Sequence, residues 1–552
     1  MTLSSPSPAP SSTHEVLNQP PPLGDLDLLA LDSALQESLV REGAEWALAQ
    51  TSRYGKLIGS AEMQRAGALA NENTPKLHTH DRYGHRIDEV EFHPSWHTLM
   101  RAAVEAGIHC GPWRDPRPGA HVARAALMML SAVNEAGHGC PISMTYSVVP
   151  ALAREPKLLE EWKPRVASLE YDPRPLPAPQ KKGVLFGMAM TEKQGGSDVR
   201  ANTTRAEPIG ARGAGNEYLL TGHKWFCSAP MNDAFLVLAQ AEGGLSCFLL
   251  PRWTPDGKRN GFQIQRLKDK CGNRSNASSE IELRAAWARM VGEEGRGVHT
   301  ILEMVNHTRL DCVLGAAGMM RACVMHACHH AGHRSAFGKR LSEQPLMRAV
   351  LADMAIESEA ATVLSLRLAR AYDNPGEAPF RRIATAISKY WVCKRSAPLS
   401  AEALECLGGN GVVEEAPLAR LYREAPVNSV WEGSGNVICL DVLRAIAKEP
   451  QSVAALVDEL RLSRGADKRL DLHREALEHD LAGPLEPALA RTLVERLALA
   501  LQGALLVRHS PAAVADGFCA TRLGGAWGHT FGSLPKSVEA GAILARAWPA
   551  LA

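Results

Sequence analysis

The chain has 552 residues, more than one hydrophobic core usually serves, which indicates several domains. It is 45% hydrophobic and 22% charged, as globular proteins are, and a net charge of +1 excludes a global electrostatic attraction to nucleic acid or to a membrane surface. Twelve cysteines without a C-x-x-C pair predict reduced, buried thiols and a cytoplasmic location, and the lack of any run of 18 apolar residues predicts no membrane-spanning segment.

The N-terminal third of the chain has a helical pattern after a polar start. Residues 1–22 are rich in Ser and Pro and lack the basic start and apolar stretch of a secretory signal, so we expect a disordered tail. Residues 23–182 are expected to form an N-terminal helical domain, because stretches such as 32–49 and 121–136 carry apolar residues at three- and four-residue spacing. A Pro-rich linker, 171–182, closes this domain.

The pattern then changes to short β-type runs and returns to helices. We predict a β domain over 183–290, a helical bundle over 291–447 and a helical extension over 448–552, so the chain belongs to the α+β class. The predicted strands are 184–189, 218–221, 224–228, 234–238, 245–250, 262–264 and 279–283.

A glycine-containing loop follows the first predicted strand. Residues 190–199 (MTEKQGGSDV) carry hydroxyl side chains, and Gly195 with Gly196 lets backbone N–H groups turn towards an acceptor. The same residues also suit an ordinary turn, which the spacing alone favours. The loop is thus either a structural turn or one wall of a site for a polar, planar ligand.

Two motifs resemble the signatures of acyl-CoA dehydrogenases, flavoproteins that oxidise the α,β bond of a thioester. The first runs from Ala189 to Ala201 and contains Met-Thr-Glu and Gly-Gly-Ser-Asp; the second runs from Glu405 to Glu424 and contains Gly-Gly-Asn-Gly-Val and Arg420. The resemblance implies an N-terminal α-helical domain, a central β-barrel domain and a C-terminal four-helix bundle, here followed by the helical extension. It also implies FAD as the cofactor.

Glu432 is the candidate catalytic base. It lies between a tryptophan and a Gly-Ser-Gly turn, where partial desolvation would raise its pKa towards the range of a useful base. The resemblance implies that Glu432 removes the α-proton of an acyl group while the β-hydrogen leaves as hydride to the flavin. Some relatives carry the base on another helix, but here no carboxylate stands beside Arg309, which leaves Glu303 as the second candidate. Ser197 and Arg309 are the implied substrate contacts.

The resemblance also assigns the cofactor contacts. The flavin-binding candidates are Met190, Thr191, Ser197, Trp225, Phe226, Ser228, Gly408, Gly409, Gly411, Trp431, Gly433, Ser434 and Asn436. Core packing is the alternative for Trp225 and Phe226, and because strand neighbours point to opposite faces we expect at most one of them to lie flat on the ring. Arg334, Phe337 and Gln344 resemble a segment that reaches a neighbouring subunit's FAD, which implies a homo-oligomer, with a tetramer expected.

Four histidines raise the question of a metal. His326, His329, His330 and His333 are spaced so that several could share one helix face. No carboxylate is spaced to complete a ligand set, so we predict a polar interface or a solvent-facing helix and no metal site.

Three segments are more similar to the AidB-type, adaptive-response branch of the family: 77–97, 268–278 and 426–429. This resemblance implies weak activity on a small acyl-CoA or related substrate, double-stranded DNA binding through the extension, and protection against alkylation damage. From residue 448 onwards, however, twelve basic residues face twelve acidic ones. The extension is as well explained by a role in covering the bundle and in oligomerisation.

Basic residues still gather in two places. One comprises Arg461, Arg464, Lys468 and Arg469, with Asp467 and Asp471 among them; the other is the stretch 52–86. Two alternatives to a dehydrogenase stay open: a DNA-associated protective protein with a structural flavin, and an acyl-CoA oxidase.

Overall fold

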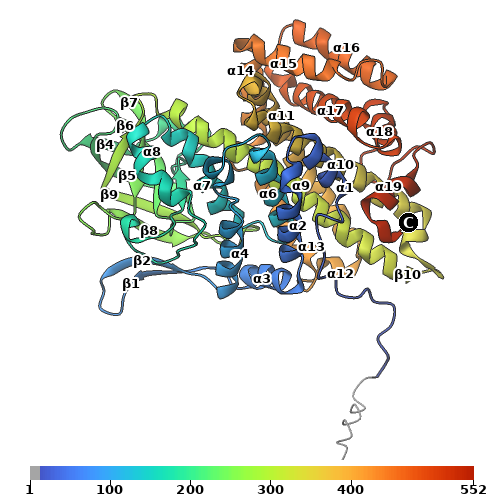
Figure 1. Cartoon of the computed structure of the whole chain (residues 1–552), viewed down its shortest axis with the longest axis horizontal. Coiled ribbons are helices and arrows are strands. Elements are labelled where there is room, and N and C mark those ends of the chain that lie inside the picture. The colour runs from blue at the N-terminus through green and yellow to red at the C-terminus, as the bar shows by residue number, and fades with distance from the viewer. Residues whose placement is uncertain (1–12, 552) are drawn as a thin grey trace, which may run out of the picture.

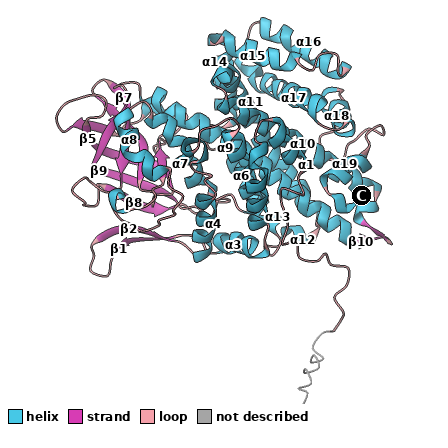
Figure 2. Ribbon diagram, in the orientation of Figure 1, coloured by secondary structure: helices cyan, strands magenta, loops and turns pink. Residues whose placement is uncertain are grey.

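The computed structural model describes residues 13–551, so residues 1–12 of the expected tail lie outside the described residues. Helices and one β domain are arranged side by side, with the β domain at one end and the bundle and extension at the other (Figure 1, Figure 2). The expected architecture is confirmed: an N-terminal helical domain, a middle β-barrel domain and a C-terminal helical domain followed by further helices.

The N-terminal region is helical except for one hairpin. Its elements are α1 (Ser33–Arg41), α2 (Leu48–Ile58), α3 (Ala61–Glu72), β1 (Lys76–His80), β2 (Arg86–Glu91), α4 (Pro94–Glu105), α5 (Gly111–Arg114), α6 (Ala120–Asn134), α7 (Gly139–Leu152) and α8 (Pro156–Val166). Helix α1 begins where the Asp32 carboxylate accepts a hydrogen bond of 3.0 Å from Leu35 N. The hairpin is a feature that the helical pattern did not indicate, because its strands are mostly polar and only β1 alternates half-buried and exposed residues.

Part of the expected tail is attached to the fold. Within residues 13–22, Asn18 is hydrogen-bonded to Ser335, and the Pro21 carbonyl lies 2.8 Å from His329 Nε2. The expectation of a disordered tail therefore does not hold for these residues. The sequence pattern did not reveal this attachment because both partners lie more than 300 residues away along the chain.

The β domain is a seven-stranded sheet closed on itself. Its strands are β3 (Phe186–Ala189), β4 (Arg205–Pro208), β5 (Glu217–Ser228), β6 (Ala234–Ala241), β7 (Gly244–Pro251), β8 (Phe262–Leu267) and β9 (Ser278–Val291). Strand β6 pairs with both β4 and β7, which closes a ring through β5 and β9. The predicted strand segments all fall within or overlap these elements.

The bundle and the extension form the remaining helices. Their elements are α9 (Gly297–His333), β10 (Ser335–Ala336), β11 (Lys339–Arg340), α10 (Pro345–Asp373), α11 (Ala378–Cys406), α12 (Gly409–Val412), α13 (Pro417–Asn428), α14 (Gly435–Lys448), α15 (Pro450–Arg461), α16 (Lys468–Ala482), α17 (Ala490–His509), α18 (Ala512–Phe518) and α19 (Ala540–Ala547). A π-helical turn, Cys519–Leu523, follows α18.

Helix α9 lies at the centre of the molecule. It packs against α6, α7, α10, α11 and α13. Among the described helices it is the one long and apolar enough to cross a membrane, yet 89% of its most apolar window is buried within the protein, as in the core helix of a globular fold. Its Asp311 forms a buried ion pair with Arg124 of α6; the Arg124 Nη2 to Asp311 Oδ2 distance is 2.7 Å and the two side chains are 1% and 3% exposed.

A buried arginine attaches the extension to the bundle. Arg522, in the π-helical turn, is ion-paired with Asp353 and, at 2.9 Å, with Glu357 of α10, and all three side chains are buried. Asp353 also accepts a hydrogen bond of 2.9 Å from Gly532 N. A buried carboxylate pair without its cation is costly, so this contact fixes the extension in place.

We expect Arg522→Ala to lower the free energy of unfolding by about 3–5 kcal/mol, because it leaves Asp353 buried without a counter-charge and Glu357 with Arg395 alone. Denaturant unfolding followed by circular dichroism measures this. The matched control is Arg461→Ala, which breaks a solvent-exposed pair with Glu478 and should cost about 1 kcal/mol or less. Equal losses in both variants would show that Arg522 does not fix the extension.

Candidate active site

The loop between α13 and α14 turns the Glu432 side chain inwards. Glu432 has φ +59° and Gly433 has φ +114°, two successive residues in conformations with positive φ. Such a φ is strained for glutamate. At Gly433 a Cβ atom would lie 2.9 Å from Ile438 Cδ1, so the loop requires glycine there.

Side chains from two bundle helices hold this loop. Thr308 Oγ1 of α9 donates a hydrogen bond of 2.8 Å to Glu432 Oε2, and the Arg309 Nε group donates one of 3.1 Å to the Glu432 carbonyl. Lys389 Nζ of α11 donates to the Gly433 carbonyl at 2.5 Å. Arg309 is itself held by Asp441 of α14 at 2.8 Å. The carboxylate is therefore positioned by the helices on both sides of the loop.

The electrostatic surroundings of Glu432 suit a general base. Burial raises the pKa of this carboxyl group, while the hydrogen bond from Thr308 and the charges of Arg309 and Lys389 lower it. Burial is the largest of these effects, and the pKa lies above its ordinary value. A carboxylate with a raised pKa binds a proton more strongly, which is what proton abstraction from carbon requires.

The glycine-containing loop is anchored by a buried ion pair. Glu192 accepts a hydrogen bond of 2.7 Å from Lys224 Nζ, and both side chains are fully buried. Burial would raise the pKa of Glu192, but Lys224 and the donors Thr203 and Thr204 hold it below its ordinary value. The Thr191 carbonyl accepts a bond of 2.8 Å from Trp225 N of β5. The loop is thus fixed at its base, with Ser197 exposed and Met190 and Thr191 half-buried.

Trp225 and Phe226 do not follow simple strand alternation. The register between β5 and β9 shifts between Lys224 and Cys227, as at a β-bulge. The Lys268 ammonium consequently lies near both rings, 3.6 Å from the Trp225 centroid and 4.5 Å from that of Phe226. Because the bulge interrupts the alternation here, strand geometry no longer requires these neighbours to face opposite sides, and which ring lies on the flavin stays a prediction. Phe226 is 47% exposed and so is not a core residue of the barrel.

Cys140 of α7 lies where the glycine-containing loop meets the bundle. Burial raises the pKa of its thiol to about 12. Like Met190, it packs against an apolar cluster that contains Met304 and Val305 of α9, and Thr308, which holds Glu432, follows on the same helix. The glycine-containing loop and the helix that positions Glu432 therefore adjoin one cluster. Ser228 is half-buried, 3.4 Å from Ser278 between the hydroxyl oxygens. Among the other predicted contacts in the Glu432 loop, Trp431 is half-buried, whereas Ser434 and Asn436 are exposed.

The remaining predicted cofactor residues lie elsewhere in the chain. Arg334 follows the end of α9, and Thr308 lies on the same helix, about 40 Å away along its axis. Gly408, Gly409 and Gly411 follow the end of α11, about 25 Å along that helix from Lys389. Within one chain the structure does not bring these residues to Glu432.

Some residues of the second signature, Glu405 to Glu424, have a structural role. At Gly411 a Cβ atom would lie 2.0 Å from the Leu404 carbonyl oxygen, whereas Gly408 and Gly409 face open space. Glu424 is buried and accepts a hydrogen bond of 2.9 Å from Asn273 Nδ2. Glu424 therefore packs against the loop before β9 and does not lie on a solvated helix face.

The second candidate base and the histidines take other roles. Glu303 is paired with Arg154 at 2.5 Å. The rings of His329 and His333 lie with centroids 4.4 Å apart, tilted by 50° to each other, and His330 is buried. No group of His, Cys, Asp or Glu suited to a metal ion occurs among residues 13–551.

Several residues of the site were missed by sequence reasoning. Thr308, Lys389, Asp441, Lys224 and Cys140 each contact or adjoin a predicted residue, and each comes from a segment far from it in sequence. The one available signal was Thr308, which directly precedes the implied substrate contact Arg309.

The glycine-containing loop and residues Trp225, Phe226 and Ser228 of β5 are here called the β wall. This wall fits a large, planar cofactor that carries phosphate, such as FAD. Two partly exposed aromatic rings lie next to the hydroxyl-bearing loop, and three cations surround Trp225: Lys193 and Arg266 lie at 5.7 and 5.8 Å from its centroid, beyond Lys268. Aromatic faces pack against a planar ring, and cations and backbone N–H groups bind phosphate oxygens.

Three family models match consecutive parts of the chain. These are the adaptive response protein AidB N-terminal domain over residues 18–173, the acyl-CoA dehydrogenase middle domain over 187–286 and the acyl-CoA dehydrogenase C-terminal domain over 295–447. Together they span the helical, β-barrel and bundle regions.

Known proteins are similar over nearly the whole chain. AidB of Escherichia coli (strain K12) is 46% identical over 516 residues, 93% of this chain and 94% of that protein. Acyl-CoA dehydrogenase family member 11 of Caenorhabditis elegans is 31% identical over 502 residues, 86% of this chain and 78% of that protein. The crystal structure of Caenorhabditis elegans ACDH-11 in complex with C11-CoA superposes with a TM-score of 0.81 at 28% identity and covers 92% of each chain.

The hydrogen bond from Thr308 to Glu432 leads to a testable prediction about the pKa of Glu432. We expect Thr308→Val to raise the pKa of Glu432 further, because a donor to the ionised carboxylate stabilises that form and its loss favours the protonated one. Infrared titration of the carboxyl band, assigned with Glu432→Gln, measures the change. Thr300→Val is the control, since that hydroxyl bonds to Arg296 O on the same helix. An unchanged or lowered pKa in Thr308→Val would contradict the assignment.

Proposed function

Because this chain belongs to the acyl-CoA dehydrogenase family, in the branch of the adaptive response protein AidB, we propose that Glu432 is the base of an α,β-dehydrogenation. Proteins of this family bind FAD, and the chain is a flavoprotein of the FAD-dependent oxidoreductase type. When bound, FAD accepts the hydride that leaves the β-carbon. The observation that carries the proposal is the half-buried Glu432 carboxylate, which is hydrogen-bonded to Thr308 and has a raised pKa.

Each residue of the site has a separate task in this proposal. Glu432 Oε2 removes the α-proton, and Thr308 orients the carboxylate before the transfer. Arg309 and Lys389 hold the backbone of the loop in its strained conformation. Met190, Thr191, Ser197, Trp225, Phe226 and Ser228 form the flavin wall, and Ser197 and Arg309 contact the substrate.

The substrate class is a small acyl-CoA or a related compound with an acidic C–H bond. Support comes from the family and from the relative whose structure contains C11-CoA. The activity we propose is weak, as the AidB-type resemblance implies. For assembly we propose a homotetramer: Phe337 is 99% exposed at the far end of α9, where a neighbouring subunit could receive it. Twelve free cysteines, ten of them buried, support a cytoplasmic location.

Replacing the base should separate chemistry from cofactor binding. We expect purified Glu432→Gln to stay yellow, with absorbance near 450 nm, and to lose anaerobic flavin bleaching by a short branched acyl-CoA by about 100-fold or more, because general-base catalysis contributes about that much. Glu303→Gln, which breaks a pair with Arg154 instead, is the control and should bleach normally.

Equal bleaching by both variants would show that another residue is the base. A wild-type protein that stays colourless after addition of FAD would show that the chain has no flavin site. Reoxidation by dioxygen after bleaching distinguishes an acyl-CoA oxidase, in which it is fast, from a dehydrogenase.

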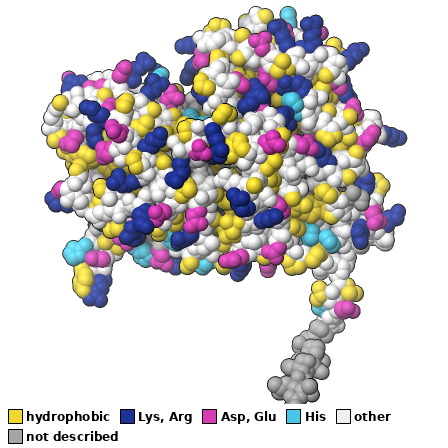
Figure 3. Space-filling view, in the orientation of Figure 1, with side chains coloured by type: hydrophobic (Ala, Val, Ile, Leu, Met, Phe, Trp, Pro, Cys, Tyr) yellow, Lys and Arg dark blue, Asp and Glu magenta, His cyan; other side chains and the backbone are white. Residues whose placement is uncertain are grey.

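A second proposed function is duplex DNA binding with protection against alkylation, supported by the AidB-type resemblance. The structure limits the cations available for it. Arg461 and Arg469 are paired with acidic residues at 2.8 and 2.5 Å, whereas Arg464 and Lys468 are exposed without an ion pair among the described residues. On the face shown in Figure 3, basic and acidic side chains are interspersed over the extension.

We expect DNA binding, if the extension carries it, to weaken linearly in log affinity with log salt concentration, because cations release counterions from phosphates. Arg464→Glu combined with Lys468→Glu should reduce affinity about tenfold or more, while Glu432→Gln should leave it unchanged. Fluorescence anisotropy with a labelled duplex measures both. Binding that is insensitive to salt, or equal in the charge-reversed variant, would exclude the extension as the DNA site.

A further inference from the structure

We propose that the two ends of the chain form a collar around the end of α9 and hold the β10–β11 hairpin in the conformation that receives a neighbouring subunit's cofactor. The inference rests on the proposed homotetramer and on the family resemblance, which implies that Arg334, Phe337 and Gln344 contact a neighbouring subunit's FAD. The collar comprises Asn18 and Pro21 on the N-terminal side and Trp548 and Leu551 on the C-terminal side.

Asn18 pairs with the hairpin as a neighbouring strand would. Its Nδ2 donates to the Ser335 carbonyl at 2.8 Å, and its Oδ1 accepts from Ser335 N at 2.7 Å. Its own carbonyl accepts from Arg334 Nη1 at 2.7 Å. Asn18 has φ +57°, a conformation that asparagine tolerates better than most residues. Both backbone groups of Ser335 and the guanidinium of Arg334 are therefore engaged by one residue.

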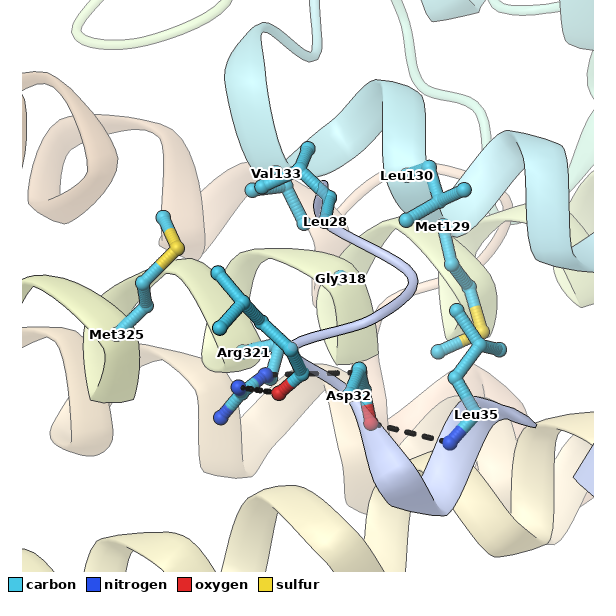
Figure 4. Close-up of a pocket in the computed structure, with 10 residues that line it drawn as sticks. Leu28, Asp32, Leu35, Met129, Leu130, Val133, Gly318, Arg321 and Met325 are labelled. Carbon is cyan, nitrogen blue, oxygen red and sulfur yellow. Dashed lines mark hydrogen bonds and ion pairs between the residues drawn. The ribbon is translucent and has the colours of Figure 1, made fainter. Parts of the chain in front are cut away.

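The segment that follows Asn18 and Pro21 is itself attached to the core, which fixes one end of the N-terminal side of the collar. Arg321 of α9 donates to the Leu31 carbonyl, and its Nε lies 3.6 Å from the Asp32 carboxylate (Figure 4). The cavity beside them is about 10 Å³, enough for no more than a water molecule. His329, one turn before the hairpin, lies 2.8 Å from the Pro21 carbonyl.

The C-terminal side meets the same turn of α9. The Trp548 ring is buried, with its centroid 6.3 Å from that of His329. Leu551 packs on Gly332, where an added Cβ would lie 2.9 Å from Leu551 Cδ2. In Figure 1 the C-terminus and β10 lie at the same end of the molecule. His329 thus contacts both ends of the chain.

The last helix of the extension is tied to two other regions. Arg546 of α19 pairs with Glu37 of α1 at 2.7 Å and with Glu359 of α10 at 2.8 Å. The C-terminal part of the collar is therefore held by the N-terminal domain and the bundle together. This gives the extension a role within the flavoprotein that does not involve any other macromolecule.

The hairpin needs such support. Its strands have two residues each, and an isolated hairpin is at best marginally stable in water. Phe337 at its tip is almost fully exposed and has φ +54°. Inside the hairpin, Gln344 Nε2 donates to the Ala336 carbonyl at 3.1 Å. If the collar orders the β10–β11 hairpin before the partner's cofactor binds, that binding costs less conformational entropy.

The experiment uses the full-length FAD-loaded protein and two readouts: hydrogen exchange of residues 334–343, and the rate of FAD release after dilution. Asn18→Gly removes the side-chain bonds and leaves the positive φ permissible. We expect faster exchange, on the order of tenfold for two lost hydrogen bonds, and faster release of FAD. Glu15→Ala, an exposed neighbour without a hydrogen bond among the described residues, is the matched control. Leu551→Ala should act in the same direction as Asn18→Gly.

The possible results are distinguishable. Unchanged exchange in Asn18→Gly and Leu551→Ala would overturn the collar. Faster exchange with unchanged FAD release would also overturn it, provided that Arg334→Ala speeds release and so shows that the hairpin holds FAD. If Arg334→Ala leaves FAD release unchanged as well, the proposed cofactor role of the hairpin fails, and the inference fails with it for that separate reason.

Discussion

The buried ion pair between Arg124 and Asp311 is the contact on which the rest of the molecule depends. It fixes α9 against α6 less than one turn from Thr308, the residue that holds the Glu432 carboxylate. Two unpaired charges at that depth would cost several kcal/mol, so the two helices cannot slide without losing the pair. Helix α9 is followed directly by the β10–β11 hairpin. The position of α9 therefore determines where both the Glu432 carboxylate and the β10–β11 hairpin lie.

The sequence predicted the segments in which local pattern and local structure agree. The strands of the β domain, the order of domains and the turn that carries Glu432 were recognisable from composition, periodicity and two signatures, whereas the positive φ of Glu432 was not. What could not be predicted depends on contacts between distant segments. The bulge at Trp225 and Phe226 arises from the pairing of β5 with β9, and Asn18 acquires its role from Ser335, over 300 residues away. Thr308 and Lys389 look like ordinary helix residues until the loop packs on them.

The helical extension carries equal numbers of basic and acidic residues, and these residues have different structural roles. Twelve cations and twelve anions suggested either a weakened nucleic-acid surface or a cover for the bundle. In the structure, Arg522 and Arg546 point into the protein and hold the extension to α10 and α1, and Arg461 and Arg469 are neutralised locally. A count of charges therefore overstates what is available to a polyanion. Few of these cations remain free for phosphates, and the arginines that are buried have a structural role.

The strained Glu432 loop also has a consequence for how this protein tolerates change. A glutamate at positive φ whose pKa is raised by burial costs stability, and the cost of ionising it is incurred as the pH rises from its ordinary pKa through the raised one. Glycine at this position would relieve both the backbone strain and the partly buried charge, yet it would remove the proposed base. The strained conformation is therefore maintained by the contacts that α9 and α11 make with the loop.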